Sequence, residues 1–163
     1  MFSFCNLTSN DIFVDVKAED FKSILFHIIK YSRIPRKKEV FKAVTDRENL
    51  GTTAIGHNVA IPHCRLDNFS GFYIKVAVFK EHLGYIAPTG DEIRFMFLVI
   101  GPENGIAHYL KALSHISRVM NKSALRKDLL NVRTKAQIKN ILCKYENEML
   151  KEEALERKTA TWK

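Results

Sequence analysis

Two apolar stretches decide the fold of this chain: Phe72–Phe79, which reads FYIKVAVF, and Arg94–Ile100, which reads RFMFLVI. Both are short and rich in β-branched and aromatic residues, as β-strands are. Their apolar density predicts that both faces of each strand are buried, near the centre of a sheet. Gly101 and Pro102 end the second strand, and a loop over Gly84–Gly90 separates the two strands.

Helical patterns precede these strands. A short strand is predicted over Ile12–Val16, followed by a helix from about Ala18 to Tyr31. Pro35 suits the first turn of a second helix, which runs to about Asp46. Helices that alternate with strands in this way indicate an α/β layered domain.

Further helices follow the central strands. One begins near Ile106, a short one covers 124–130, and the capping-box pair Thr134 and Gln137 opens the last. The helical spacing predicts which side chains of the first of these helices face the core: Ile106, Leu110, Leu113, Ser117 and Met120.

The composition indicates one globular domain. The 163 residues are 46% hydrophobic, with a net charge of +8. We expect the domain to span 1–145, with a charged helical extension or tail over 146–163. The positive charge favours an acidic protein partner or a phosphorylated ligand. Nucleic acid is disfavoured, because the basic residues are dispersed and Arg36–Lys38 is their only tight run.

The cysteines and the apolar runs bear on the location of the protein. The chain has an odd number of widely spaced cysteines, Cys5, Cys64 and Cys143. This pattern predicts free thiols in a reducing compartment, which by default is the cytoplasm. The longest apolar runs are too short to cross a bilayer, and the N-terminus lacks the pattern of a secretory signal.

One histidine has a distinctive setting. His63 follows Pro62, whose ring restricts the backbone immediately before the imidazole, at the end of a small strand-like piece over Val59–Ile61. Such a residue is presented outward, as a nucleophile must be. A neutral imidazole has a lone pair on one nitrogen, while its N–H is usually held by a carbonyl or a carboxylate.

His108 is the second candidate. It lies in the first turn of the helix that follows Pro102, where backbone N–H groups favour anions. His115 is two helical turns further along the same face. Taken alone, His108 is better explained as an ordinary surface histidine than as a site residue, and we assign His27 and His82 structural roles.

Two other chemistries remain open at this point. His57, His63 and Cys64 are possible zinc ligands, but no CxxC or HExxH spacing accompanies them. Cys64 is also a possible thiol nucleophile. Since neighbouring side chains in an extended segment point to opposite faces, His63 is not placed to activate it.

The segment Arg47–His63, RENLGTTAIGHNVAIPH, closely resembles the active-site signature of type 2 enzyme IIA domains. These domains belong to the phosphoenolpyruvate-dependent phosphotransferase system, in its fructose, mannitol and nitrogen-regulatory class. The resemblance extends over about 6–144, and the segment HYLKAL from His108 to Leu113 resembles the family's second-histidine helix. Cys64 stands where the family usually has glycine.

The resemblance implies a mixed β-sheet flanked by helices. It implies that His63 accepts a phosphoryl group, that His108 donates a hydrogen bond to the phosphoryl oxygens, and that Arg47 adds positive charge. Thr52 and Thr53 are expected to line the site. No cofactor or metal is implied.

The resemblance also implies a function. We expect a phosphotransfer relay of the nitrogen-regulatory type, without independent turnover of a small substrate. Its phosphoryl donor would be phosphorylated HPr or a nitrogen-type paralogue, and it would act on regulated target proteins through its phosphorylation state. The alternative is a sugar-uptake enzyme IIA that passes the group to enzyme IIB of a fructose- or mannitol-type permease.

Overall fold

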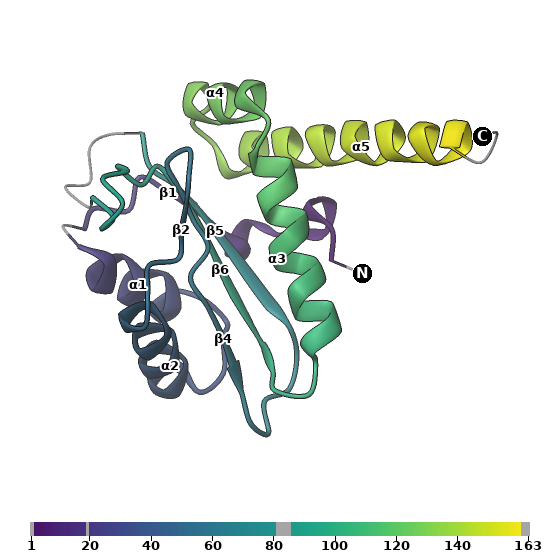
Figure 1. Cartoon of the computed structure of the whole chain (residues 1–163). Coiled ribbons are helices and arrows are strands. Elements are labelled where there is room, and N and C mark those ends of the chain that lie inside the picture. The colour runs from purple at the N-terminus through teal and green to yellow at the C-terminus, as the bar shows by residue number, and fades with distance from the viewer. Residues whose placement is uncertain (1, 19, 81–85, 161–163) are drawn as a thin grey trace.

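The computed structural model describes residues 2–18, 20–80 and 86–160 (Figure 1). Short 3-10 helices η1 and η2 precede the first strand, which is followed by two helices, five consecutive strands and three further helices. Their bounds are η1 Phe4–Asn6, η2 Ser9–Asp11, β1 Ile12–Val14, α1 Phe21–Lys30, α2 Lys37–Asn49, β2 Ala54–Gly56, β3 Val59–Ala60, β4 His63–Leu66, β5 Tyr73–Val78, β6 Phe95–Pro102, α3 Ile106–Met120, α4 Ser123–Asn131 and α5 Lys135–Ala160.

The strands form one mixed sheet in the order β1-β5-β6-β3-β2, and β4 also pairs with β6. β5 and β6 are antiparallel, whereas β1 is parallel to β5, and β3 and β4 are both parallel to β6. The apolar stretches Phe72–Phe79 and Arg94–Ile100 therefore contain the central strands. The predicted mixed sheet flanked by helices is confirmed.

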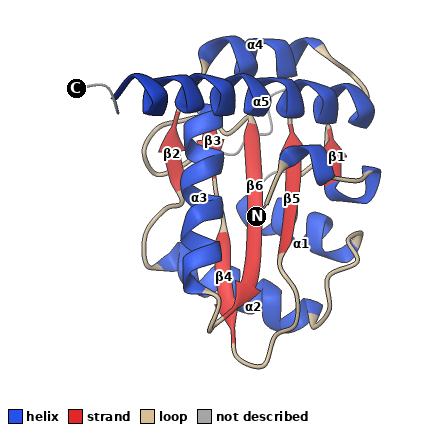
Figure 2. Cartoon of the chain, turned by 90° about the vertical axis from the view of Figure 1, so that its right-hand side faces the viewer, coloured by secondary structure: helices blue, strands red, loops and turns tan. Residues whose placement is uncertain are grey.

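Helices cover both faces of the sheet (Figures 1 and 2). On one face α1 and α2 pack over a core that contains Met96, Leu98 and Ile100. On the other face α3, α4 and α5 pack over Phe95, Phe97 and Val99. Alternate residues of β6 thus enter opposite cores, which explains why its sequence is apolar without interruption.

The predicted buried face of α3 is wrong. Ile106 and Leu110 are 52% and 57% exposed. Of the predicted face only Met120 is buried, and the helix instead buries Tyr109, Ala112, His115, Ile116, Val119 and Met120. The apolar residues of this helix are so frequent that two stripes, about one residue apart in register, fit the same sequence. Packing on the sheet selects the stripe that contains Tyr109 and His115.

The C-terminal helix begins as predicted. The Thr134 N–H donates to the Gln137 side chain at 3.0 Å, and the Gln137 N–H donates to the Thr134 hydroxyl at 3.2 Å, so the capping box is confirmed. α5 then runs to Ala160 and extends beyond the rest of the domain (Figure 1). Among the described helices, none combines the length and the apolar character that crossing a membrane requires.

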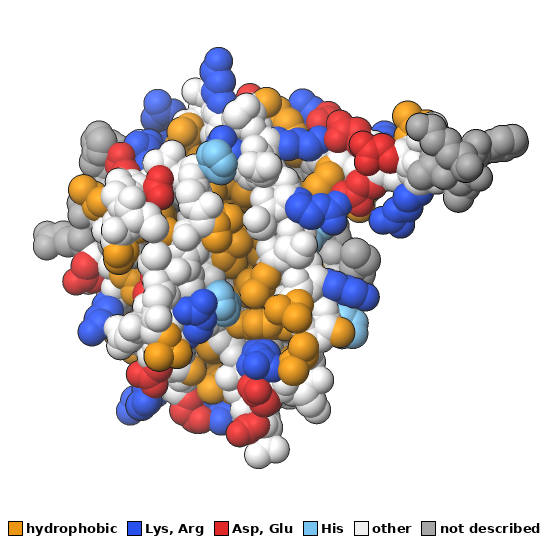
Figure 3. All heavy atoms as spheres, in the orientation of Figure 1, with side chains coloured by type: hydrophobic (Ala, Val, Ile, Leu, Met, Phe, Trp, Pro, Cys, Tyr) orange, Lys and Arg blue, Asp and Glu red, His pale blue; other side chains and the backbone are white. Residues whose placement is uncertain are grey.

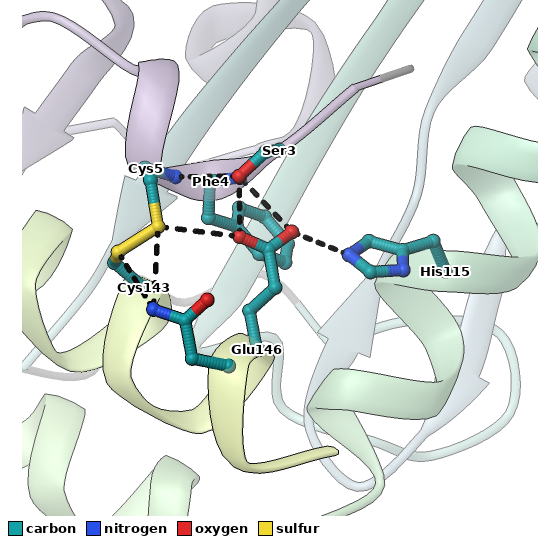
Figure 4. Close-up of a disulfide and its surroundings, with 7 residues drawn as sticks. Ser3, Phe4, Cys5, His115, Cys143 and Glu146 are labelled. Carbon is teal, nitrogen blue, oxygen red and sulfur yellow. Dashed lines mark hydrogen bonds and ion pairs between the residues drawn. A yellow bond between two sulfur atoms is a disulfide. The ribbon is translucent and has the colours of Figure 1, made fainter. Parts of the chain in front are cut away.

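The predicted free thiols are wrong for two of the three cysteines. Cys5 of η1 and Cys143 of α5 form a disulfide, with their Cα atoms 4.7 Å apart (Figure 4). Only Cys64 is a free thiol. The pairing joins residues 138 positions apart in the sequence, so spacing alone did not reveal it. It arises because η1 packs against α5.

Candidate functional site

A tight hairpin leads into the site. β2 and β3 are antiparallel, and His57 and Asn58 between them have φ angles of 55° and 64°. Two consecutive residues with positive φ form the turn whose twist matches a hairpin. His57, which the sequence indicated only as a possible zinc ligand, is therefore a turn residue. The Asn58 side chain donates to the Glu92 carbonyl at 2.8 Å and ties the turn to the segment before β6.

Pro62 interrupts the strand that presents His63. β3 pairs with β6 at Val59 and Ala60, and β4 resumes the parallel pairing at His63, opposite Val99. Between them the Val99 N–H donates to the Pro62 carbonyl at 2.9 Å. The backbone therefore follows β6 on both sides of Pro62 and holds the His63 Cα at a defined position at the start of β4.

Arg47, in the last turns of α2, lies against the His63 ring. Its Nε–H donates to His63 Nε2 at 3.1 Å, and its Nη1 donates to the Gly51 carbonyl at 3.0 Å. An arginine N–H can only donate, so Nε2 is the ring nitrogen that accepts. Nδ1 therefore carries the ring proton and donates it to the Ile61 carbonyl at 2.6 Å. The site selects one tautomer, with the lone pair on Nε2.

The surroundings keep this imidazole neutral. Burial lowers the pKa of His63 below its ordinary value, the bond to the Ile61 carbonyl opposes this, and the Arg47 charge lowers the pKa further. The net effect is a pKa below 6.5. His63 is thus a neutral, oriented base near pH 7, which is the form a nucleophile needs.

Tyr109 of α3 is a neighbour that the sequence analysis missed. Its ring meets the His63 ring edge to face, with centroids 5.8 Å apart, and the Arg65 guanidinium lies 5.7 Å from the Tyr109 centroid. Burial raises the pKa of Tyr109, so the phenol stays protonated. Its hydroxyl has no hydrogen-bond partner among the described residues. The signal that could have found it was the alternative buried stripe of α3, which contains Tyr109.

The structure does not bring His108 to His63. His108 is exposed on α3 and lines a separate cavity with Lys111 and His115. It has no hydrogen bond or ring contact with any described residue. Consecutive residues of a helix point about 100° apart, so the turn that directs Tyr109 toward His63 directs His108 elsewhere.

The two threonines are used within their own loop. The Thr53 hydroxyl donates to Glu48 at 2.6 Å, and its N–H donates to the same carboxylate at 3.0 Å. The Thr52 hydroxyl accepts from the Ala54 N–H at 3.2 Å. Both side chains therefore shape the connection between α2 and β2, and Thr53 is 5% exposed.

Cys64 lies on the other side of β4 from the His63 ring, in the core with α1 and α2. Burial raises the pKa of its thiol to about 12, so it is not a thiolate near neutral pH. Within the part of the chain that the structure describes, no group of three or more His, Cys, Asp or Glu side chains is placed to hold a metal ion.

The geometry supports nucleophilic attack by His63 Nε2 on a negatively charged electrophile. The lone pair is oriented, the opposite nitrogen is held by a carbonyl, and the Arg47 guanidinium lies against the ring. The Arg65 guanidinium lies over the neighbouring Tyr109 ring and is paired with Glu103. Arginine binds phosphoryl oxygens well, because its planar donors match their geometry.

Comparisons with known proteins agree with this site. The profile of the phosphoenolpyruvate-dependent sugar phosphotransferase system, EIIA 2, matches residues 6–145. The nitrogen regulatory protein of Bradyrhizobium diazoefficiens is 32% identical over 106 residues, which cover 65% of this chain and 69% of that protein.

Solved structures show the same fold. The crystal structure of the nitrogen regulatory protein IIA-Ntr from Neisseria meningitidis superposes with a TM-score of 0.74 at 25% identity, covering 83% of this chain and 94% of that one. Enzyme IIA mannitol from Escherichia coli, solved in complex with phosphorylated enzyme IIB mannitol, superposes with a TM-score of 0.70 at 16% identity, covering 84% and 96%. The chain belongs to the type 2 EIIA family of the phosphoenolpyruvate-dependent sugar phosphotransferase system.

Proposed function

We propose that this protein is a phosphotransfer relay of the nitrogen-regulatory type, and that it carries the phosphoryl group on His63 Nε2. The main observation that supports the proposal is the tautomer of the His63 ring. Its Nδ1 is bonded to the Ile61 carbonyl, and its Nε2 faces Arg47. The family match and the similarity to nitrogen regulatory proteins support the same function. A relay of this kind would act in the cytoplasm, and this expectation now rests on the family and not on free thiols, because Cys5 and Cys143 are paired.

The donor in this proposal is a phosphohistidine on HPr or a nitrogen-type paralogue. The Nε2 lone pair attacks phosphorus, an Nε2–P bond forms, and the donor N–P bond breaks with its electron pair returning to the donor ring. A donor ring protonated on its other nitrogen leaves as neutral imidazole. His63 becomes a phospho-imidazolium that keeps its Nδ1 proton, and the Ile61 carbonyl stabilises this cation.

Arg47 and Tyr109 are proposed to hold the transferred group. Arg47 faces Nε2 in the free protein, so a small shift of its guanidinium would place it on the phosphoryl oxygens. Tyr109 has a protonated phenol beside the same ring and would donate one further hydrogen bond. Thr52 and Thr53 would act indirectly, by fixing the loop between α2 and β2.

Exposed apolar side chains frame the site and support a protein as the donor. Leu50 after α2 is 86% exposed, and Ile106 and Leu110 on α3 are more than half exposed. Figure 3 shows hydrophobic side chains gathered in a hollow on this face, with Lys or Arg and His side chains at its border. A contiguous apolar patch with a charged border is typical of a protein-binding surface.

The test is to incubate the protein with phosphoenolpyruvate, enzyme I and HPr, and to measure acid-labile phosphate. We expect labelling of the wild type and none of His63→Ala. The matched control is His27→Gln on α1, which should label like the wild type. An unlabelled wild type, or a labelled His63→Ala, would contradict the assignment of His63.

The second candidate is a sugar-uptake enzyme IIA. The structure solved with phosphorylated enzyme IIB mannitol supports it, because its enzyme IIA chain has the same fold as this one. The two functions differ in the fate of the phosphoryl group. Adding purified enzyme IIB of the fructose or mannitol type to the labelled protein separates them: rapid transfer to enzyme IIB favours sugar uptake, and retention on His63 favours the regulatory function.

A further inference from the structure

A cavity of about 400 Å³ lies on the side of α3 that carries His108. Its floor is the beginning of β5, at Phe72–Lys75, and α3 forms one wall. The opposite wall is the N-terminal segment, which crosses this face of the sheet beside α3 (Figure 2). His63, Arg47 and Tyr109 do not line it, so the cavity is distinct from the proposed phosphoryl site. Its volume is in the range of small-molecule sites.

The N-terminal wall is held in place by two separate attachments. The Ser3 hydroxyl and the Phe4 N–H donate to the Glu146 carboxylate at 2.6 and 3.1 Å, as Figure 4 shows. The disulfide between Cys5 and Cys143 then fixes the same segment to α5. The cavity is thus bounded by anchored chain, and a pre-formed site binds without the entropy cost of ordering its walls.

The charged side chains that line the cavity indicate the sign of the charge that its ligand carries. The one carboxylate among the described lining residues, Asp11, bonds to the Lys75 ammonium. Burial raises the pKa of Asp11, but the bonds from Lys75 and Thr8 outweigh it and lower the pKa overall. His115 is bonded to Glu146 at 2.6 Å. In the described part of the chain, Lys111, His108 and the Asn6 amide have no partner. All three can donate hydrogen bonds, and Lys111 is a cation.

The rest of the lining is mostly apolar, apart from the hydroxyl groups of Ser3 and Tyr73. Apolar side chains from the floor and from both walls contribute, and they include two phenylalanines. The apolar residues are Phe2, Leu7, Phe72, Ile74 and Ala112. A ligand that fits both parts of the cavity has an anionic acceptor group at the Lys111 side and a ring or short hydrocarbon body against the phenylalanines.

We propose that this cavity binds a small organic carboxylate with an aromatic or apolar body. The carboxylate bonds to the Lys111 ammonium and the His108 imidazole, and the body packs against Phe2 and Phe72. This is a binding site separate from the phosphoryl site, and the proposal does not depend on phosphotransfer. The proposal assigns a function to the face of α3 that carries His108 and His115, which the site at His63 does not involve.

The test is a titration of the uniformly ¹⁵N-labelled, unphosphorylated protein with phenylacetate, followed by two-dimensional NMR. We expect saturable shifts of the backbone amides of Phe72–Lys75 and of α3 around Ala112. Phenethylamine has the same ring with the opposite charge and should give no saturable shift there. Phenylacetamide, which is neutral, should bind more weakly than phenylacetate.

Two charge reversals on exposed lysines form the matched pair. Lys111→Glu should weaken phenylacetate binding at least tenfold, or about 1.4 kcal/mol. Lys127→Glu, on an exposed position of α4, should change it by less than about twofold, because distant surface charges are screened. The same spectra show that each variant is folded.

Three results would overturn the proposal. They are the absence of saturable phenylacetate shifts at the cavity amides, equal binding of phenethylamine, and unweakened binding by a folded Lys111→Glu. Since no phosphoryl donor is present in the experiment, these outcomes are independent of whether His63 accepts phosphate.

Discussion

Two imidazoles of this domain, His63 and His115, are held in opposite ways. His63 donates to a backbone carbonyl, and its other nitrogen faces a guanidinium at the surface. His115 is 7% exposed and bonds to the Glu146 carboxylate at 2.6 Å. The carbonyl and the guanidinium leave the His63 ring neutral, with an oriented lone pair. The buried Glu146 carboxylate instead holds the His115 ring in a fixed hydrogen bond between α3 and α5.

The surroundings of Glu146 show why the second arrangement is structural. Burial raises the pKa of Glu146, but hydrogen bonds from His115, Ser3 and the Phe4 N–H lower it overall. One carboxylate therefore joins η1, α3 and α5, beside the disulfide (Figure 4). The difference between the two sites predicts that changes near His63 alter phosphotransfer and that changes near His115 alter stability.

The largest effect is expected for Glu146→Ala. Removing one partner of a buried, hydrogen-bonded group leaves the others without a partner, so the free energy of unfolding should fall by about 3–5 kcal/mol. Urea denaturation measures it. Glu156→Ala, an exposed carboxylate on the same helix, should change the free energy by less than about 0.5 kcal/mol. Comparable losses in both variants would contradict a special role for Glu146.

The disulfide should contribute the next largest effect. The double variant Cys5→Ser with Cys143→Ser should lose about 2–4 kcal/mol of unfolding free energy, since the cross-link restricts the unfolded chain. Dithiothreitol should lower the melting temperature of the wild type but not that of the double variant. If alkylation of the unreduced, unfolded wild type labels all three cysteines, the pairing is wrong.

Arg47→Gln should slow phosphorylation without unfolding the protein. Loss of a charged donor at the phosphoryl group costs about 1.5–3 kcal/mol, or roughly a tenfold to hundredfold lower rate. The variant should also have a higher His63 pKa, because the Arg47 charge lowers it. Lys42→Gln, on an exposed position of the same helix, is the control. A rate equal to that of the control would remove Arg47 from the site.

Tyr109→Phe should have a smaller effect than Arg47→Gln. It removes one neutral hydroxyl donor, which is worth about 0.5–1.5 kcal/mol, and keeps the ring contact with His63. The comparison variant is His108→Ala. The family resemblance predicts slower phosphorylation of His108→Ala, whereas the position of His108 in the structure predicts an unchanged rate. Rapid-quench kinetics on both variants distinguishes the two predictions.

The smallest effect is expected from pH. A neutral His63 is the competent form, and its pKa is lowered from 6.5, so more than half of it is already neutral at pH 6.5. Raising the pH from 6.5 to 7.5 should therefore change the neutral fraction less than twofold. Competence is lost only as the pH falls below 6.5. NMR titration of the His63 ring checks this, and a midpoint above 6.5 would contradict it.

Much of the fold follows from local sequence. The apolar density of the segments that form β5 and β6 identified the central strands, and Thr134 with Gln137 identified the start of α5. Pro62 before His63 indicated an oriented imidazole, and the segment from Arg47 to His63 indicated its partner. These signals lie within a few residues or within one continuous motif, where backbone preferences and hydrophobic periodicity act directly.

Other features depend on contacts between distant parts of the chain. The disulfide requires η1 to meet α5, and the Glu146 carboxylate requires three elements to converge. The rotation of α3 decides that Tyr109, and not His108, faces His63. Two apolar stripes on that helix are nearly equivalent in sequence. The sequence therefore determined that a helix lies at this position, and only packing against the sheet determined which of its side chains contacts His63.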